Sequence, residues 1–253
     1  MERSILSPSE NAESLVEIGS ARTNLTFVKE FLLGILGGAF IAFAAQGSNV
    51  AIHTIDSVGL SKTLAGALFA TGLMMVVISG AELFTGNSLI VISCLQRKSK
   101  WVSMFRNWLF VYLGNFAGSL LIAYFVLHSG QLGFSEGLLG GYTIKIAAYK
   151  TGLSFESAFF MGILCNWLVC IAIWMASASK DIAGKILAIF FPIWLFITSG
   201  FEHSVANMYY IPAGILAKAN EEFAQAAISL GVSAEQIANL NWGTLFTRNL
   251  IPV

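Results

Sequence analysis

Charged residues are scarce in this chain. Its 253 residues include 14 Lys and Arg and 14 Asp and Glu, or 11% in all, whereas soluble domains carry about 25%. The two signs balance, and no run of basic residues is interleaved with aromatic ones, which excludes a nucleic-acid-binding surface. Apolar residues make up 56% of the chain, and the mean hydropathy is +0.74. Such a composition predicts an integral membrane protein that contacts a lipid bilayer.

Cysteine is also rare, and its spacing excludes a metal or disulfide framework. Cys94, Cys165 and Cys170 lie in or beside apolar segments, with no C-x-x-C spacing, and the chain has no H-E-x-x-H motif. We therefore expect no metal and no cofactor, and three thiols that serve as small packing residues. The first 22 residues are too polar to contain the apolar core of a cleavable signal peptide, so we expect the first membrane span to direct insertion.

One polar pattern occurs twice inside apolar sequence. Residues 79–87 (SGAELFTGN) and residues 199–207 (SGFEHSVAN) share the form S-G-x-E-x-x-x-x-N. A carboxylate, a glycine and an asparagine in mid-segment are costly in lipid, so such a site must be shielded by protein. Paired, glycine-interrupted segments in the two halves of a membrane chain indicate a solute site at a repeat interface. Transport is therefore the leading hypothesis.

The apolar segments predict five membrane spans. They cover approximately residues 31–49, 64–95, 108–127, 159–178 and 186–212. In the second and fifth, the apolar run before Gly80 or Gly200 is shorter than the roughly 20 residues that a crossing needs, so we predict a broken helix with a re-entrant turn in each. Ahead of the first span, residues 1–26 contain the capping box Ser7-Pro8-Ser9-Glu10, which predicts a short helix at the membrane surface.

The distribution of Lys and Arg predicts the orientation. Basic residues gather between the second and third spans and after the fourth, whereas acidic residues follow the fifth, which places residues 1–26 in the cytoplasm. The segment with Lys145 and Lys150 is then expected to be an external loop, and the partly helical stretch 218–247 is also external. The residues concerned are Arg97, Lys98, Lys100, Arg106, Lys180 and Lys185 on one side, and Glu221, Glu222 and Glu235 on the other.

Further fragments recur in the same order. Residues 34–36 (GIL) match residues 162–164, and Arg106-Asn107 matches Arg248-Asn249. Residues 27–128 and 155–253 are thus two repeats of a single transmembrane channel domain, and three spans per repeat make the second copy inverted relative to the first. The repeat also predicts a sixth span that begins near Arg248, so we expect the native chain to continue past Val253.

The ordered motifs resemble those of the formate/nitrite transporter family. The resemblance covers nearly the whole chain and rests on residues 81–87 (AELFTGN), 162–170 (GILCNWLVC), 199–207 and 249–253 (NLIPV). It implies an all-α, aquaporin-like fold and a homopentamer, with one pore per protomer, in the bacterial cytoplasmic membrane. It further implies passage of small monovalent anions, together with protons. Overall likeness favours formate, or nitrite, and a hydrosulfide channel of the same family is the alternative.

His203 is the strongest candidate for contact with the solute. An anion at mid-membrane depth needs positive potential or a neutralising proton, and an imidazole, with an ordinary pKa of about 6.5, can supply either. The resemblance places His203 and Thr85 at the pore centre, where the imidazole hydrogen-bonds or protonates the anion, and Asn166 is a further candidate there. The alternative is a histidine satisfied by a backbone partner inside a helix bundle.

Glu82 and Glu202 admit two interpretations. An ionised carboxylate on the anion path would repel the solute, whereas one turned toward free backbone N–H groups would stabilise the interrupted helix. We favour the structural role at the helix breaks, which we also assign to Asn87 and Asn207, and the amides of Asn166 and Asn207 have enough donors to complete such networks. For Lys150, the resemblance implies attraction of anions at the pore mouth, and the alternative is an ordinary solvated lysine.

The resemblance also implies apolar constrictions. It assigns Leu73, Leu83 and Phe196 to the cytoplasmic side, and Phe69 and Val169 to the external side. Apolar narrowings reject hydrated ions, so a neutralised solute passes more easily than its anion. Without the resemblance, these residues would be assigned to the bundle core.

Small residues at four-residue spacing predict close helix packing. Gly34 with Gly38, and Gly114 with Gly118, form small-x-x-x-small pairs in the first and third spans. Such pairs let helix backbones approach one another in a membrane. We expect these glycines to pack within a protomer or between protomers.

Two other classes of function are compatible with a polar site in an apolar chain. An intramembrane acid/base enzyme using Glu82, Glu202 and His203 would need a nucleophile with its companions or a metal cluster, and the sequence shows neither. A neutral-solute pore of the aquaporin kind would, by resemblance, carry paired N-P-A turns, which are absent. We therefore expect a channel or transporter and no enzyme.

Overall fold

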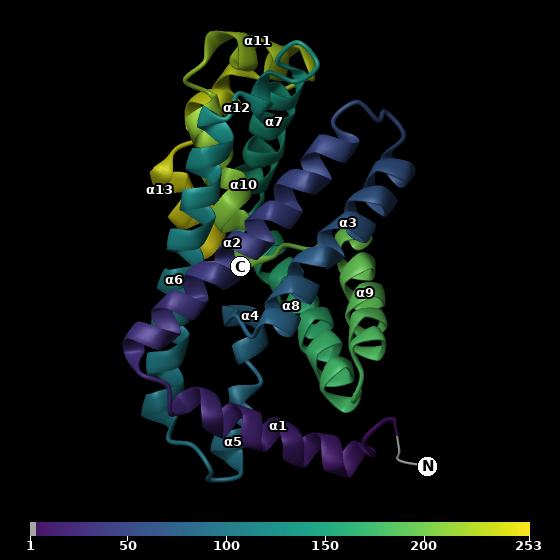
Figure 1. Cartoon of the computed structure of the whole chain (residues 1–253). Coiled ribbons are helices and arrows are strands. Elements are labelled where there is room, and N and C mark those ends of the chain that lie inside the picture. Colours follow the sequence, from purple (N-terminus) through teal and green to yellow (C-terminus); the bar gives the residue numbers. More distant parts are fainter. Residues whose placement is uncertain (1–3) are drawn as a thin grey trace.

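Long apolar helices dominate the computed structural model, which describes residues 4–253 (Figure 1). Within this range, five helices are long and apolar enough to cross a membrane. Each agrees with a predicted span or with the first part of one. They are α2 (Phe27–Ile52), α3 (Val58–Ser79), α6 (Trp101–His128), α8 (Phe155–Ala178) and α9 (Ile182–Ser199).

Shorter helices cover the two ends of the bundle. Helix α1 (Pro8–Thr23) lies across one end, and α11 (Glu221–Ser229) and α12 (Ala234–Asn239) lie at the other (Figure 1). The predicted capping box is present at the start of α1, where the Ser7 N–H donates to the Glu10 carboxylate at 2.7 Å. The remaining short elements are α5 (Ile90–Leu95), η1 (Gln131–Gly133), α13 (Trp242–Leu245) and the π-helical η2 (Phe246–Leu250).

Both signatures interrupt a helix. Helix α3 ends at Ser79 and α4 (Phe84–Asn87) begins after a four-residue gap, while α9 ends at Ser199 and α10 (Ser204–Ala217) follows after the same interval. Gly80 and Gly200 terminate the first half-helices with φ of +77°, a left-handed conformation that glycine adopts without steric cost. The first interruption spans residues 80–83, and Thr85 already lies inside α4.

Helices α2 and α6 touch through their glycines. A Cβ on Gly34 would lie 2.8 Å from the Val111 carbonyl oxygen, and a Cβ on Gly38 or Gly118 would overlap the backbone of the facing helix. Side chains at these positions would force the helices apart. The small-residue pairs therefore pack within one chain.

An ion pair between a partly exposed arginine and a buried glutamate joins the start of α6 to the first turn of α2. The Arg106 guanidinium lies 2.8 Å from the Glu30 carboxylate and also donates to the Thr23 and Leu25 carbonyl oxygens. Glu30 is fully buried, so its charge needs this partner. Arg106 thus belongs to the helix and its packing, although the sequence groups it with the loop charges.

Candidate functional site

The two helix interruptions meet at Thr85 and His203. Thr85 lies in α4 and His203 caps α10, and their Oγ1 and Nε2 atoms are 3.1 Å apart. Both side chains are buried, with 6% and 3% of their surface exposed. The two candidates for the solute site therefore form one hydrogen-bonded pair between the repeats.

The start of α10 sets the tautomer of His203. The Ala206 N–H donates to Nδ1 of the ring at 3.0 Å, so Nδ1 must present a lone pair. The neutral ring then carries its hydrogen on Nε2, which donates to Thr85. The sequence posed a backbone partner and a solute-site role as alternatives; the backbone partner is present at Nδ1, and Nε2 has Thr85 as its partner.

A small cavity adjoins this pair. Its volume is about 240 Å³, and we call it the chamber. Asn166 lines it from α8, and the Asn166 amide donates to Ser88 Oγ at 3.4 Å. Cys165, which we expected only to pack, lines it as well. The other lining residues are Phe84, Thr85, Ser88, Phe159, Gly162, Ile163, Glu202, His203, Ser204, Pro252 and Val253.

The chamber offers donors and little negative charge. His203, Thr85 and Asn166, each of which carries a hydrogen-bond donor, line it, and α10 begins at its wall. The N-terminal end of a helix favours a negative group, as in transporters built from discontinuous helices. The one carboxylate in the lining, that of Glu202, is held by a lysine.

Glu82 anchors a polar network beside the first interruption. Its carboxylate accepts from the Asn87 amide at 2.6 Å, and the same amide donates to the Asn107 carbonyl oxygen at 2.7 Å. Arg22, which projects from α1, completes the network with its Nε 3.1 Å from the carboxylate. The ion pair thereby connects the surface helix to the break.

Glu202 anchors an equivalent network at the second interruption. Its carboxylate accepts from the Asn207 amide at 2.7 Å, and that amide also donates to the Asn249 carbonyl oxygen at 2.7 Å. The basic partner here is Lys150, whose ammonium lies 2.9 Å from the carboxylate. The arrangement of one Glu and two Asn therefore occurs in both repeats, as an inverted repeat predicts, and each copy is paired with a cation from outside the repeats.

The carboxylates differ from our expectation in their partners. We expected free backbone N–H groups, but in the described residues the donors to Glu82 and Glu202 are side chains. The reason is that a basic residue reaches each carboxylate from a neighbouring helix, and a charged donor stabilises a buried carboxylate more strongly than a neutral one.

Lys150 is neither in a loop nor solvated. The segment that we expected to be an external loop forms α7 (Leu138–Gly152), which packs against α10. The Lys150 side chain is only 12% exposed, pairs with Glu202 and lies 5.2 Å from the centre of the Tyr210 ring. Its position beside the second interruption agrees with a place near the pore, but its charge is already compensated.

Asn115 also belongs to the site, although the repeated motifs in the sequence do not include it. From the middle of α6, its carbonyl oxygen accepts from the Phe84 N–H at 2.9 Å, and its amide donates to the Gly34 and Glu82 carbonyl oxygens. It thus pairs backbone groups that the break leaves without a helical partner. The sequence feature that could have identified Asn115 is the presence of a single Asn in the middle of an apolar span.

The five apolar candidates form one buried cluster. Leu73, Leu83, Phe196, Phe69 and Val169 are each at most 2% exposed and belong to the same core. The Phe69 ring packs edge-on against Phe196, which in turn lies 5.9 Å from the His203 ring. The two groups that we assigned to opposite sides are therefore in direct contact.

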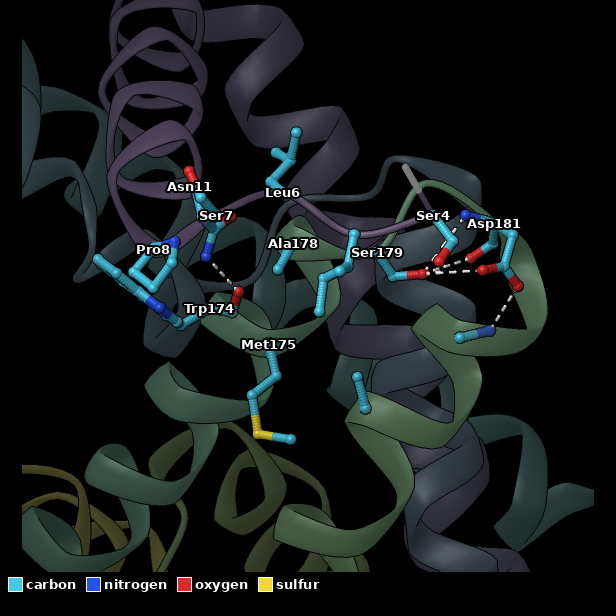
Figure 2. Close-up of a pocket in the computed structure, with 13 residues that line it drawn as sticks. Ser4, Leu6, Ser7, Pro8, Asn11, Trp174, Met175, Ala178, Ser179 and Asp181 are labelled. Atoms are coloured by element: carbon cyan, nitrogen blue, oxygen red, sulfur yellow. Dashed lines mark hydrogen bonds between the residues drawn. The ribbon is translucent and has the colours of Figure 1, made fainter. Parts of the chain in front are cut away.

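A larger cavity lies away from these residues. It measures about 750 Å³ and lies between the segment that leads into α1 and the turn between α8 and α9 (Figure 2). Its charged lining residue is Asp181, and the Gly184 N–H, which donates to that carboxylate, lowers the pKa of Asp181. An ionised carboxylate repels anions, and the cavity shares no residue with the chamber. Although this cavity is larger than the chamber, its lining does not suit an anion, so we do not assign the solute site to it.

Comparison with known proteins agrees with this geometry. A family model described as formate/nitrite transporter matches residues 9–253. The chain belongs to the formate/nitrite transporter family. Among relatives in this family, the formate channel FocA of Haemophilus influenzae is 36% identical over 252 residues, which cover 98% of this chain and 88% of that protein. The uncharacterized transporter YrhG of Bacillus subtilis is 41% identical over 219 residues, which cover 83% of this chain and 80% of that protein.

Solved structures of the family share the fold. A pentameric formate channel with formate bound superimposes with a TM-score of 0.79 at 35% identity, over 90% of this chain and 89% of that one. An ion channel of the same family gives a TM-score of 0.71 at 25% identity, over 96% of each chain. The helical membrane fold and the formate/nitrite transporter family, both predicted from the sequence, are confirmed.

Proposed function

We propose that this chain forms a membrane channel for small monovalent anions, formate first among them. The observation that carries the proposal is the hydrogen bond between Thr85 and His203 at the wall of the chamber, where the two interruptions meet. Relatives named as formate channels and a neighbour with formate bound support this choice of solute.

In this proposal, His203 acts as a hydrogen-bond donor. The neutral ring has one hydrogen, on Nε2, and giving it away would leave an imidazolate, which is not accessible near neutrality. A second proton on Nδ1 would break the bond from Ala206. The geometry thus favours a ring that turns its Nε2–H from Thr85 to the anion, while Thr85 and Asn166 donate to the remaining oxygen lone pairs.

The apolar cluster completes the proposed path. Leu73, Leu83, Phe196, Phe69 and Val169 offer no polar side-chain atom, so a hydrated ion that meets them must lose its water. A solute that carries a proton loses less hydration energy and passes more easily. We propose that these residues are the constrictions and that protons accompany the anion.

The proposed assembly is a homopentamer with a cytoplasmic N-terminus. A relative of the same fold is pentameric, and α8 and α9 expose apolar side chains that need lipid or a second copy as a neighbour. Arg97, Lys98 and Lys100 lie in the turn between α5 and α6, near α1, whereas Glu221 and Glu222 belong to α11 at the opposite end (Figure 1). This asymmetry supports a cytoplasmic N-terminus in a bacterial inner membrane.

Uptake of labelled formate into proteoliposomes tests the proposal. We expect uptake well above that of protein-free vesicles and no uptake of glycerol, which has no charge for the site to recognise. Competition by nitrite and by hydrosulfide ranks the anions. Formate uptake equal to that of empty vesicles would contradict the proposed function, and turnover of a peptide or lipid substrate would favour an enzyme instead.

A further inference from the structure

The turn between α5 and α6 carries a cluster of positive charge. Arg97, Lys98 and Lys100 are all exposed there, and we call these three residues the basic turn. None of them forms an ion pair in the part of the chain that the structure describes. No Asp or Glu occurs in residues 83–135 either, so the surrounding sequence supplies no compensating charge.

Hydrogen bonds fix the backbone of the basic turn. The Ser93 carbonyl oxygen accepts from the N–H groups of Lys98 at 2.9 Å and Ser99 at 3.3 Å. The Ser99 hydroxyl lies 2.8 Å from that of Ser93 and 2.9 Å from that of Thr23, at the end of α1. Arg97 has a φ of +58°, which is costly for a residue with a Cβ and persists only where its surroundings enforce it. The cations therefore project from a backbone that is already ordered, and little freedom is lost when they bind a partner.

Exposed apolar side chains flank the basic turn on both sides in the sequence. Leu95 precedes it, and Trp101, Val102 and Phe105 follow it, with 68%, 46%, 79% and 57% of their surfaces exposed. The last three belong to α6, which is long and apolar enough to cross the membrane. An indole suits the boundary of a bilayer, because it joins an apolar body to a polar N–H group. We therefore expect the basic turn to lie level with the lipid headgroups.

The acidic residues of the neighbouring helix do not neutralise the basic turn. Helix α1 packs against α5 at the same end of the bundle (Figure 1), and it carries the exposed carboxylates of Glu13 and Glu17. Neither carboxylate pairs with a cation of the turn. A soluble acidic protein could meet the charges, but it could not follow the apolar side chains into the membrane. The combination of free cations and apolar flanks therefore favours a partner from the bilayer itself.

We propose that the basic turn binds the headgroup of an anionic phospholipid. The Arg97 guanidinium donates two parallel N–H groups to the phosphate, and Lys98 and Lys100 supply further positive charge. The acyl chains run along Trp101 and its apolar neighbours. A zwitterionic lipid also has a phosphate, but three basic side chains repel the cation that it carries. This site is separate from the path of the solute, and it holds the α5–α6 turn at the membrane surface.

Lipid binding to the purified protein in detergent tests the site. Phosphatidylglycerol and phosphatidylcholine with the same acyl chains are added in equal amounts, and native mass spectrometry counts the molecules of each that stay bound. We expect the wild type to hold at least about fivefold more phosphatidylglycerol, which is the gain expected from one basic residue near an anionic surface. This preference should vanish at about 1 M salt, where charges are screened. Exchange of Arg97, Lys98 and Lys100 for glutamine should abolish it at low salt.

A matched variant removes the same amount of charge elsewhere. Lys62→Gln with Lys145→Gln and Lys180→Gln takes away three exposed lysines outside the basic turn and should keep the wild-type preference. Both triple variants leave every described ion pair intact, so we expect them to fold. The salt dependence of the wild type needs no variant and keeps the test decisive in any case.

Four results would overturn the lipid site. They are equal binding of the two lipids to the wild type, a preference that persists at high salt, an unchanged preference in the basic-turn variant, and an equal loss in both triple variants. Inorganic phosphate at the same concentration as the lipid should not displace phosphatidylglycerol, because it cannot contact the apolar flanks. Displacement would replace the lipid site with a site for free anions. None of these measurements depends on formate flux, so the site and the proposed channel function stand or fall separately.

Discussion

His203 Nε2 and Thr85 Oγ1 lie 3.1 Å apart, although 118 positions separate the two residues in sequence. Thr85 follows the end of α3 in the first repeat, and His203 follows the end of α9 in the second. The capping of α10 sets the direction in which Nε2–H of His203 donates. The Thr85 hydroxyl opposite it can rotate. If the two residues form the proposed solute site, small changes in either one should alter flux.

Exchange of His203 for asparagine should separate capping from donation to the solute. Asparagine caps helices well, so His203→Asn should keep the Ala206 bond, fold and assemble. We expect formate flux to fall several-fold, because the shorter side chain that caps α10 no longer carries a donor to the position of Nε2. Formate flux of the variant and the wild type at one pH near neutrality checks this. A variant with the wild-type flux would assign His203 to capping alone.

Removal of the Thr85 hydroxyl should weaken solute binding with little change in shape. Thr85→Val keeps the branched side chain and loses one hydrogen bond, worth about 1 kcal/mol, so formate flux should fall about fivefold at low formate concentration. Thr85→Ser retains the hydroxyl and serves as the matched control, with flux close to that of the wild type. Equal losses in the two variants would indicate that packing, not the hydroxyl, matters.

Loss of Lys150 should destabilise the protein. Lys150→Met leaves the carboxylate of Glu202, which is 2% exposed, without its cation, and breaking such a buried pair costs about 3–5 kcal/mol. Adding Glu202→Gln should recover more than half of that loss, since the glutamine oxygen can still accept from Asn207. Thermal unfolding of the two single variants and the double variant in detergent measures the coupling. If Lys150→Met is instead stable and its flux falls only at low salt, Lys150 is a solvated lysine that attracts anions.

Glycines of α2 should differ sharply in their tolerance of a methyl group. In Gly38→Ala the new Cβ would overlap the Asn115 carbonyl oxygen, and the forced separation of α2 and α6 should cost about 1–3 kcal/mol. Gly47 lies in the same helix, and a Cβ added there would meet nothing within 4 Å, so Gly47→Ala should be neutral or stabilising by up to about 1 kcal/mol. Unfolding temperatures of the two variants provide the comparison.

Local chemistry explains which parts of the fold were predictable. Apolar length indicated the spans, and Gly80 and Gly200 within polar signatures indicated the interruptions, because lipid penalises both features unless protein shields them. The matching Arg-Asn fragments also signalled a repeated role, which the structure identifies as Asn107 and Asn249 completing the two carboxylate networks.

Partners supplied by other helices were not predictable in the same way. Arg22 reaches Glu82 only because α1 folds back across the bundle, and that path depends on tertiary packing. The helix that carries Lys150 had a readable signal in the buried stripe Ile144, Ala147, Ala148 and Thr151, which follows helical periodicity.

The glycine contact between α2 and α6 has a consequence for the route of the solute. Where Gly34 faces Gly114 and Gly38 faces Asn115, the two backbones touch, and not even a methyl group fits between them. A gap that cannot hold a methyl group cannot hold a water molecule or formate either, so this wall is watertight where the glycines meet. The proposed solute path therefore cannot run between α2 and α6 at this level, and no chain of water molecules can carry protons through the glycine contact.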